Sequence, residues 1–104
     1  MKPHQTKPRL IKNLATLLSQ LDSEAVIQAL LQDLCSPSEL QALAERLHIL
    51  PLLEQGIPYR TIAKDTGMSI TTIGRVARCM REGANGYKSI MPLLQQIQNT
   101  KENT

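Results

Sequence analysis

Apolar side chains recur at helical spacing along most of the chain. The pattern begins at Leu10, continues to Leu34 and resumes at Leu40. An α-helix turns once in about 3.6 residues, so this spacing places the apolar side chains on one face of each predicted helix. No segment alternates apolar and polar residues over a useful strand length. The sequence therefore predicts an all-α fold.

The side chains available for a core are almost entirely aliphatic. The 104 residues include no Trp, no Phe and two Tyr. A core of Leu, Ile, Val, Met and Ala favours helices packed on helices. A chain of this length fits one domain and buries only a modest fraction of its surface, so oligomerisation is expected to add stability. The few aromatic rings argue against a surface that binds RNA or single-stranded DNA by base stacking.

No segment is expected to enter a membrane or a secretory pathway. No apolar run approaches the roughly 20 residues that span a bilayer. The basic N-terminus, MKPHQTKPRLIKN, is not followed by the apolar stretch of a signal peptide. Cys35 and Cys79 lie far apart and outside any metal-ligand spacing, so both are predicted to be buried or half-buried thiols. These features predict a cytoplasmic protein without a metal site.

Charge divides the chain into three stretches. Residues 1–12 carry four basic residues and no acid, residues 13–55 carry one basic residue and six acids, and residues 56–90 carry six basic residues and two acids. A basic C-terminal half suggests a polyanionic partner, although charge alone fits an ordinary solvated surface equally well.

The chain is predicted to contain a flexible basic arm over residues 1–9, a single all-helical domain over residues 10–98 and a frayed tail over residues 99–104. The stretch SPSE, residues 36–39, has the pattern of a capping box with proline in the first helical turn, which predicts a helix start. Pro51 either kinks the helix that follows or separates it from a shorter one, and the last helix is expected to break near Pro92.

Residues 58–81 have the pattern of a helix-turn-helix, most clearly in the stretch IAKDTGMSITTIGRVAR, residues 62–78. Two short helices that cross at a steep angle need a small residue in the first helix, and Ala63 supplies it. Gly67 can adopt the left-handed backbone of the turn. Ile73 and Val76 then form the apolar face of the second helix. A plain αα-hairpin has a similar pattern and stays open as the alternative.

The opposite face of the second helix suggests what the motif binds. Residues at the N-terminal end of this helix reach base edges in a helix-turn-helix, and an arginine one turn further on can form a bidentate contact with guanine. The remaining basic side chains are better placed to neutralise phosphates. We expect DNA contacts from Ser69, Thr71, Thr72, Arg75, Arg78, Lys64, Arg60 and Arg81.

From about residue 30 to residue 82 the chain resembles the Trp repressor superfamily, and more closely its YerC/YecD-type branch of small bacterial proteins. The stretches SPSELQALAERLHILPLLEQG and RTIAKDTGMSITTIGRVAR carry the resemblance. It implies a Trp-repressor-like helical bundle that forms an intertwined homodimer. Such a dimer would place two recognition helices about 34 Å apart, in successive major grooves of a palindromic operator.

The resemblance also implies a ligand site beside the recognition helix, since the Trp repressor binds tryptophan there. The matching positions are Ser36, Arg46, Thr72 and Arg75, and the two arginines could bind a small anionic ligand. The repressor has a glycine directly after the recognition-helix arginine, which leaves room for the indole ring. Val76 occupies that position here. No cofactor is therefore expected, and tryptophan is not expected as corepressor.

These features predict a homodimeric, sequence-specific DNA-binding transcriptional regulator, with a repressor as the expected form. The alternative is a helix-turn-helix that serves as a protein-protein docking module without specific DNA binding. An enzyme is not expected, because His4 and His48 belong to no nucleophile–base arrangement and no phosphate-cradling loop is present. His48 is expected to be a partly buried helix residue.

Overall fold

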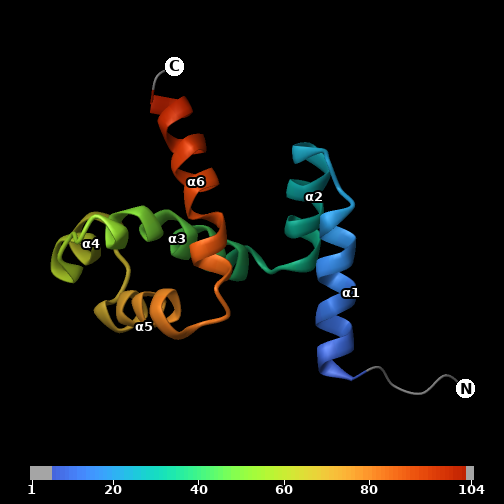
Figure 1. Ribbon diagram of the computed structural model, residues 1–104, viewed down its shortest axis with the longest axis horizontal. Helices are drawn as coiled ribbons and strands as arrows, with labels where there is room; N and C mark the ends of the chain where they lie inside the picture. The colour runs from blue at the N-terminus through green and yellow to red at the C-terminus, as the bar shows by residue number, and fades with distance from the viewer. Residues whose placement is uncertain (1–5, 103–104) are drawn as a thin grey trace, which may run out of the picture. The chain divides into compact units, whose positions relative to one another are not determined.

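A computed structural model describes residues 6–102 and shows six α-helices (Figure 1). Their order along the chain is α1 Lys7–Ser19, α2 Glu24–Leu34, α3 Pro37–Glu54, α4 Tyr59–Thr66, α5 Ile70–Glu82 and α6 Gly86–Glu102. Within the described residues there is no strand, so the predicted all-α class is confirmed. Over the same part of the chain, no helix combines the length and the apolar character that crossing a membrane requires.

The first and last helices are longer than the sequence predicted. Thr6 caps α1 by accepting a hydrogen bond from the Arg9 N–H at 3.3 Å, and Pro8 lies in the first turn, where its missing N–H costs no helical hydrogen bond. Residues 7–9 are therefore helical, although the sequence assigned them to a flexible arm, and residues 99–102 of the predicted tail belong to α6. The rest of the predicted arm and tail, residues 1–5 and 103–104, lies outside the described residues.

The chain divides into two compact units between Leu40 and Gln41, in the first turns of α3. The N-terminal unit contains α1 and α2, and neither helix has a buried residue. The C-terminal unit contains most of α3 and all of α4, α5 and α6, together with the buried core. The single domain predicted over residues 10–98 stays a prediction.

Serine caps the starts of α2 and α3. The Ser23 hydroxyl accepts a hydrogen bond from the Val26 N–H at 3.3 Å, which fixes the start of α2. At the start of α3, the Ser36 N–H donates to Glu39 Oε1 at 2.7 Å, and the Glu39 N–H donates to Ser36 Oγ at 3.2 Å. These reciprocal bonds confirm the predicted capping box. The hydrogen bond from the Ser36 backbone lowers the pKa of Glu39 below its ordinary value, and the Ser36 side chain adds to this effect.

The core of the C-terminal unit gathers aliphatic side chains from all four of its helices. Ile49, Leu50, Ile62 and Ile73 are almost completely inaccessible to solvent. The other buried members of the core cluster are Met68, Val76 and Met91. Burying a side chain of this kind contributes about 1.5–3 kcal/mol to the free energy of folding. In a core without Phe or Trp, this aliphatic burial is the main source of stability.

The two helix-interior prolines do not interrupt their helices. Pro51 is buried inside the continuous helix α3, so the sequence alternative of two separate helices is wrong. Pro92 lies inside the continuous helix α6, which also differs from the expected break. Each proline lacks one backbone donor, and packing of the flanking residues Leu50 and Met91 in the core holds the helix together at these points.

Candidate DNA-binding site

Helices α4 and α5 are joined by a short turn that is fixed by its own hydrogen bonds (Figure 1). Gly67 has φ +79° and its N–H donates to the Ala63 carbonyl at 2.9 Å, so the predicted left-handed turn residue is confirmed. The Thr66 hydroxyl donates to the Ile62 carbonyl at 2.6 Å and accepts from the Met68 N–H at 3.2 Å. This role of Thr66 was not predicted from the sequence. The signal was present, because threonine commonly caps turns through its hydroxyl.

Small residues lie on both helices where they approach each other. Ala63 is half-buried on α4 and packs against the core, as the motif predicted. On α5, a Cβ atom added to Gly74 would lie 3.9 Å from Cε2 of Tyr59, so the Tyr59 ring passes close to the glycine backbone. The sequence analysis did not assign Gly74 to this contact, because nothing in the chain order indicates which α5 residue faces Tyr59.

The inner face of α5 is anchored in the core. Ile73 and Val76 are buried, with exposed fractions of 0% and 3%, and Met80 is half-buried one turn further on. The predicted docking face of the second helix is thereby confirmed. Because these side chains fix the rotation of α5 about its axis, they also determine which of its residues face solvent.

The N-terminal end of α5 is capped by Ser69. Its hydroxyl accepts a hydrogen bond from the Thr72 N–H at 3.1 Å and donates to the Thr72 hydroxyl at 2.8 Å. Thr72 is consequently half-buried, whereas the sequence placed it among the outward-facing residues. Its hydroxyl oxygen accepts from Ser69 and retains a second lone pair, so Thr72 can still donate its own proton or accept one further hydrogen bond.

The outer face of α5 carries a row of exposed polar and basic side chains. Thr71, Arg75 and Arg78 are exposed and follow one another at intervals of four and three residues, which places them on one side of the helix. Arg81 continues the row at the C-terminal end of α5. Helix α4 adds two exposed basic side chains one turn apart, Arg60 and Lys64. All of the predicted DNA-contacting residues except Thr72 are therefore exposed, and their contact with DNA stays a prediction.

Comparison with known proteins agrees with this geometry. The sequence pattern of the Trp repressor protein family matches residues 9–96, which is most of the chain. The chain belongs to the Trp repressor family. A relative from Bacillus subtilis (strain 168), named Uncharacterized protein YerC, is 36% identical over 66 residues. That alignment covers 64% of this chain and 64% of the relative, so the chain spans less than two thirds of that relative's length.

The Trp repressor family consists of regulatory DNA-binding proteins. The match extends over α1 and α2 as well as the helix-turn-helix. The resemblance described from the sequence motifs begins only at about residue 30. The N-terminal helices share the apolar spacing of the family and no identifiable motif.

The four residues that the resemblance to the Trp repressor implied for ligand binding fall in different parts of the chain. Ser36 belongs to the N-terminal unit, where its hydroxyl accepts the Glu39 N–H and lies 3.3 Å from the Ser38 hydroxyl. Arg46 and Arg75 are exposed in the C-terminal unit, and Thr72 is held by Ser69. The assignment of these four residues to a ligand stays a prediction.

Val76 is part of the core cluster, and its exposed fraction is 3%. The side chain that replaces the repressor's glycine therefore contributes to the anchoring of α5. The expectation that tryptophan is not the corepressor rests on this residue and stays a prediction.

His48, Cys35 and Cys79 follow the sequence predictions only in part. Across residues 6–102, no group of three or more His, Cys, Asp and Glu side chains is arranged to hold a metal ion. His48 is exposed, whereas the sequence placed it partly in the core. Cys35 is a half-buried free thiol as expected, and Cys79 is an exposed free thiol, contrary to expectation. Both errors concern helix positions next to the apolar face, where the exact rotation of the helix decides burial.

Proposed function

We propose that this protein is a homodimeric, sequence-specific DNA-binding transcriptional regulator that uses α5 as its recognition helix on a palindromic operator. The observation that carries the proposal is the division of α5 into two faces. Ile73 and Val76 are buried on one face, and Thr71, Arg75 and Arg78 are exposed on the other. A helix held rigidly by its core side and bearing donors on its free side has the arrangement that major-groove reading requires.

The N-terminal end of α5 and Arg75 would supply the sequence specificity. Thr71 and Thr72 lie in the first turn, where recognition helices reach base edges. The Thr72 hydroxyl accepts one hydrogen bond from Ser69 and retains its proton and a second lone pair, so it would donate to a phosphate or form one further hydrogen bond with a base edge. Arg75, one turn further on, has the planar fork that matches the two acceptors of guanine.

The other exposed cations would supply affinity without sequence information. Arg78 and Arg81 on α5, and Arg60 and Lys64 on α4, are exposed and would neutralise backbone phosphates on either side of the groove. Such contacts release counterions, so binding should fall steeply as salt rises.

The N-terminal unit supports the homodimer in this proposal. Helix α1 exposes large apolar side chains along one stripe, with exposed fractions of 52% for Leu10, 67% for Ile11, 42% for Leu14 and 49% for Leu17. Helix α2 likewise has no buried residue. A pair of amphipathic helices without a core gains its stability by covering this face, and a second copy of the same unit offers a matching apolar face. The dimer would act on DNA in the cytoplasm.

The test is selection of bound sequences from random double-stranded DNA with the full chain, followed by affinity measurements on the selected site over a range of salt concentrations. We expect a palindromic consensus. Arg75→Ala should weaken binding to it by about 10- to 100-fold and relax the preference at one base pair in each half-site. Arg78→Ala should weaken binding to all sequences alike and reduce the salt dependence by about one ion per monomer.

Arg9→Ala is the matched control, because it removes the same side chain from an exposed position on α1, in the N-terminal unit. It should leave the affinity for the selected DNA nearly unchanged. If no sequence is enriched over competitor at low salt, the DNA-reading proposal is wrong. The docking-module alternative then gains support if Arg75→Ala abolishes binding to a protein partner.

A further inference from the structure

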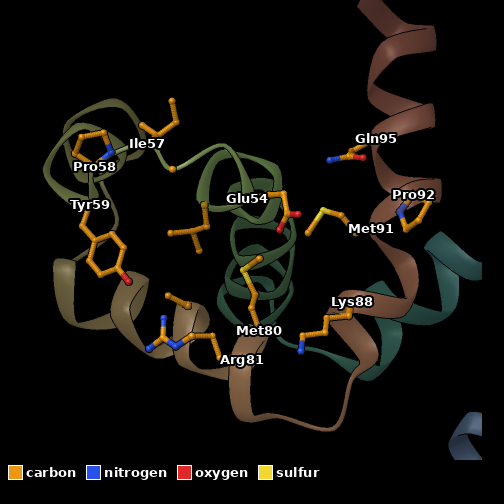
Figure 2. A pocket seen from close by; sticks show the side chains of 13 residues that line it. Glu54, Ile57, Pro58, Tyr59, Met80, Arg81, Lys88, Met91, Pro92 and Gln95 are labelled. Atoms are coloured by element: carbon orange, nitrogen blue, oxygen red, sulfur yellow. The ribbon is translucent and has the colours of Figure 1, made fainter.

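The C-terminal unit contains a cavity that shares only Arg81 with the predicted DNA-binding residues. Its volume is about 790 Å³, within the range of about 300–1,000 Å³ typical of small-ligand sites. The end of α3, the start of α4, the end of α5 and the first half of α6 enclose it (Figure 2). The α5 residues that line it, Ala77, Met80 and Arg81, include none of the positions that the Trp repressor resemblance assigned to ligand binding.

The lining combines an apolar body with a cationic end. Met80 and Met91 contribute flexible, polarizable side chains that adapt to apolar ligands of different shape. Arg81 and Lys88 contribute two exposed positive charges, against one carboxylate from Glu54. In Figure 2, Arg81 and Lys88 lie on either side of Met80, while Glu54 lies across the cavity beside Met91. An occupant with one negative charge would therefore find two cations bordering the cavity, with Met80 between them, against one carboxylate.

We propose that this cavity is an effector site for a small carboxylic acid with an apolar body, whose carboxylate is bound by Arg81 and Lys88 and whose body lies against Met80 and Met91. Guanidinium and ammonium groups form charge-assisted hydrogen bonds with a carboxylate. A neutral molecule of the same shape would forfeit these bonds and would bind more weakly. A dianion would be disfavoured by Glu54.

The site would also oppose DNA binding, and this part of the inference rests on the proposed function. Arg81 lines the cavity and is one of the cations proposed to neutralise a phosphate. A carboxylate bound by its guanidinium withdraws that charge from DNA, so the ligand would act as an inducer that releases the protein from its operator. Thermodynamic linkage requires the reverse effect as well, with DNA weakening the affinity for the ligand by the same factor.

The binding step can be tested on the full chain without DNA, using octanoate as the probe and octanamide as its neutral isostere. Titration followed by calorimetry and by amide chemical shifts should show that octanoate binds several-fold more tightly, with shifts in the residues around the cavity. Arg81→Gln and Lys88→Gln should each weaken octanoate binding by about 3- to 10-fold and leave octanamide binding unchanged.

Arg78→Gln is the matched control, because it removes the same charge three residues away on the same helix, outside the cavity lining. It should leave octanoate binding unchanged. Equal binding of octanoate and octanamide, or an equal loss in Arg78→Gln, would overturn the proposal. So would dissociation of a dimer on octanoate binding, since the cavity would then be a contact between copies of the chain.

The coupling step is tested separately on the selected operator. Saturating octanoate should weaken DNA binding by about 5-fold or more, and Arg81→Gln should abolish this effect. Octanoate binding without any effect on operator affinity would overturn the inducer role and leave the carboxylate site standing. If no operator is found, the proposed DNA-binding function is wrong, but the measured binding of octanoate to the cavity is unaffected.

Discussion

Helices α1 and α2 and helices α4 and α5 are both amphipathic pairs, but only the second pair buries apolar side chains within the single chain. Ile62 and Ile73 are almost fully inaccessible to solvent, whereas Ile11 and Leu14 have exposed fractions of 67% and 42%. The apolar spacing is helical in both pairs. An amphipathic pattern thus specifies a helix and the face that has to be covered, while the covering partner depends on what the rest of the fold supplies.

The largest effect should come from removing a buried side chain of the C-terminal unit. Ile73→Ala should lower the free energy of unfolding by about 2–5 kcal/mol, because the cavity it leaves lies at the centre of the core. Ile70→Ala is the matched control on the same helix, where the side chain is 51% exposed, and should cost less than about 1 kcal/mol. Urea unfolding followed by circular dichroism measures both. Similar losses in the two variants would contradict the assigned inner face of α5.

The second effect concerns the N-terminal unit. Leu14→Glu places a charge in the middle of the exposed apolar stripe of α1 and should raise the dissociation constant of the proposed dimer by about 100-fold, because the carboxylate would be buried without a partner. Thr16→Glu introduces the same charge on the opposite side of α1 and should leave the dimer intact. Sedimentation equilibrium distinguishes the two outcomes. If the wild-type chain is monomeric, the proposal that a second copy covers the apolar stripe of α1 is wrong.

Alanine substitutions at two glycines of the helix-turn-helix should have smaller and opposite effects on stability. Gly67→Ala should destabilise the protein by about 1–2 kcal/mol, because the residue has φ +79°, which an L side chain rarely adopts, even though a Cβ there would meet no neighbour within 4 Å. Gly74→Ala should stabilise it by about 0.5–1 kcal/mol, because the glycine is helical and its Cβ would make an ordinary contact with Tyr59. Thermal unfolding compares them, and changes of equal sign would contradict this assignment of strain.

The smallest effect is the pH dependence of the capping box at the start of α3. Because folding lowers the pKa of Glu39 from its ordinary value of 4.5, the stability it contributes is complete above that value and is lost as the pH falls through the folded pKa. Glu39→Gln should therefore lose less stability between pH 7 and pH 3 than the wild type. Ser36→Ala should be intermediate, since the Ser36 N–H still donates to the carboxylate. Urea midpoints at the two pH values would show this order, and identical pH dependence in all three proteins would contradict it.

Local features of the helix-turn-helix could be predicted from the sequence because each depends on neighbouring residues. The cap at Ser69, the left-handed turn at Gly67 and the inward pair Ile73 and Val76 follow from turn chemistry and helical periodicity. The continuity of α3 through Pro51 could not be predicted. A proline in the interior of a helix costs one helical hydrogen bond, and packing against Leu50 and its neighbours in the core decides whether the helix continues.

The candidate site was likewise predicted only in part from the sequence. Exposure of Thr71, Arg75 and Arg78 followed from the rotation of α5 that its apolar residues impose. The hydrogen bond between Ser69 and Thr72, which half-buries Thr72, depends on side-chain rotamers that periodicity does not encode. The exposure of Cys79 and His48 was mispredicted, since both lie beside an apolar face where a small change in rotation changes burial.

The sequence by itself determined that the chain is helical and that two short helices joined by a turn lie at about residues 58–81, and it predicted that this segment is a helix-turn-helix with a basic outer side. Only the tertiary structure decided which apolar faces meet within the chain, leaving the helices of the N-terminal unit uncovered while the C-terminal unit closes around Ile49, Leu50 and Ile73. It also brought Arg81 of α5 and Lys88 of α6 to one cavity. The physical reason is that periodicity acts within a turn or two of helix, whereas burial and cavities arise between residues distant in the chain.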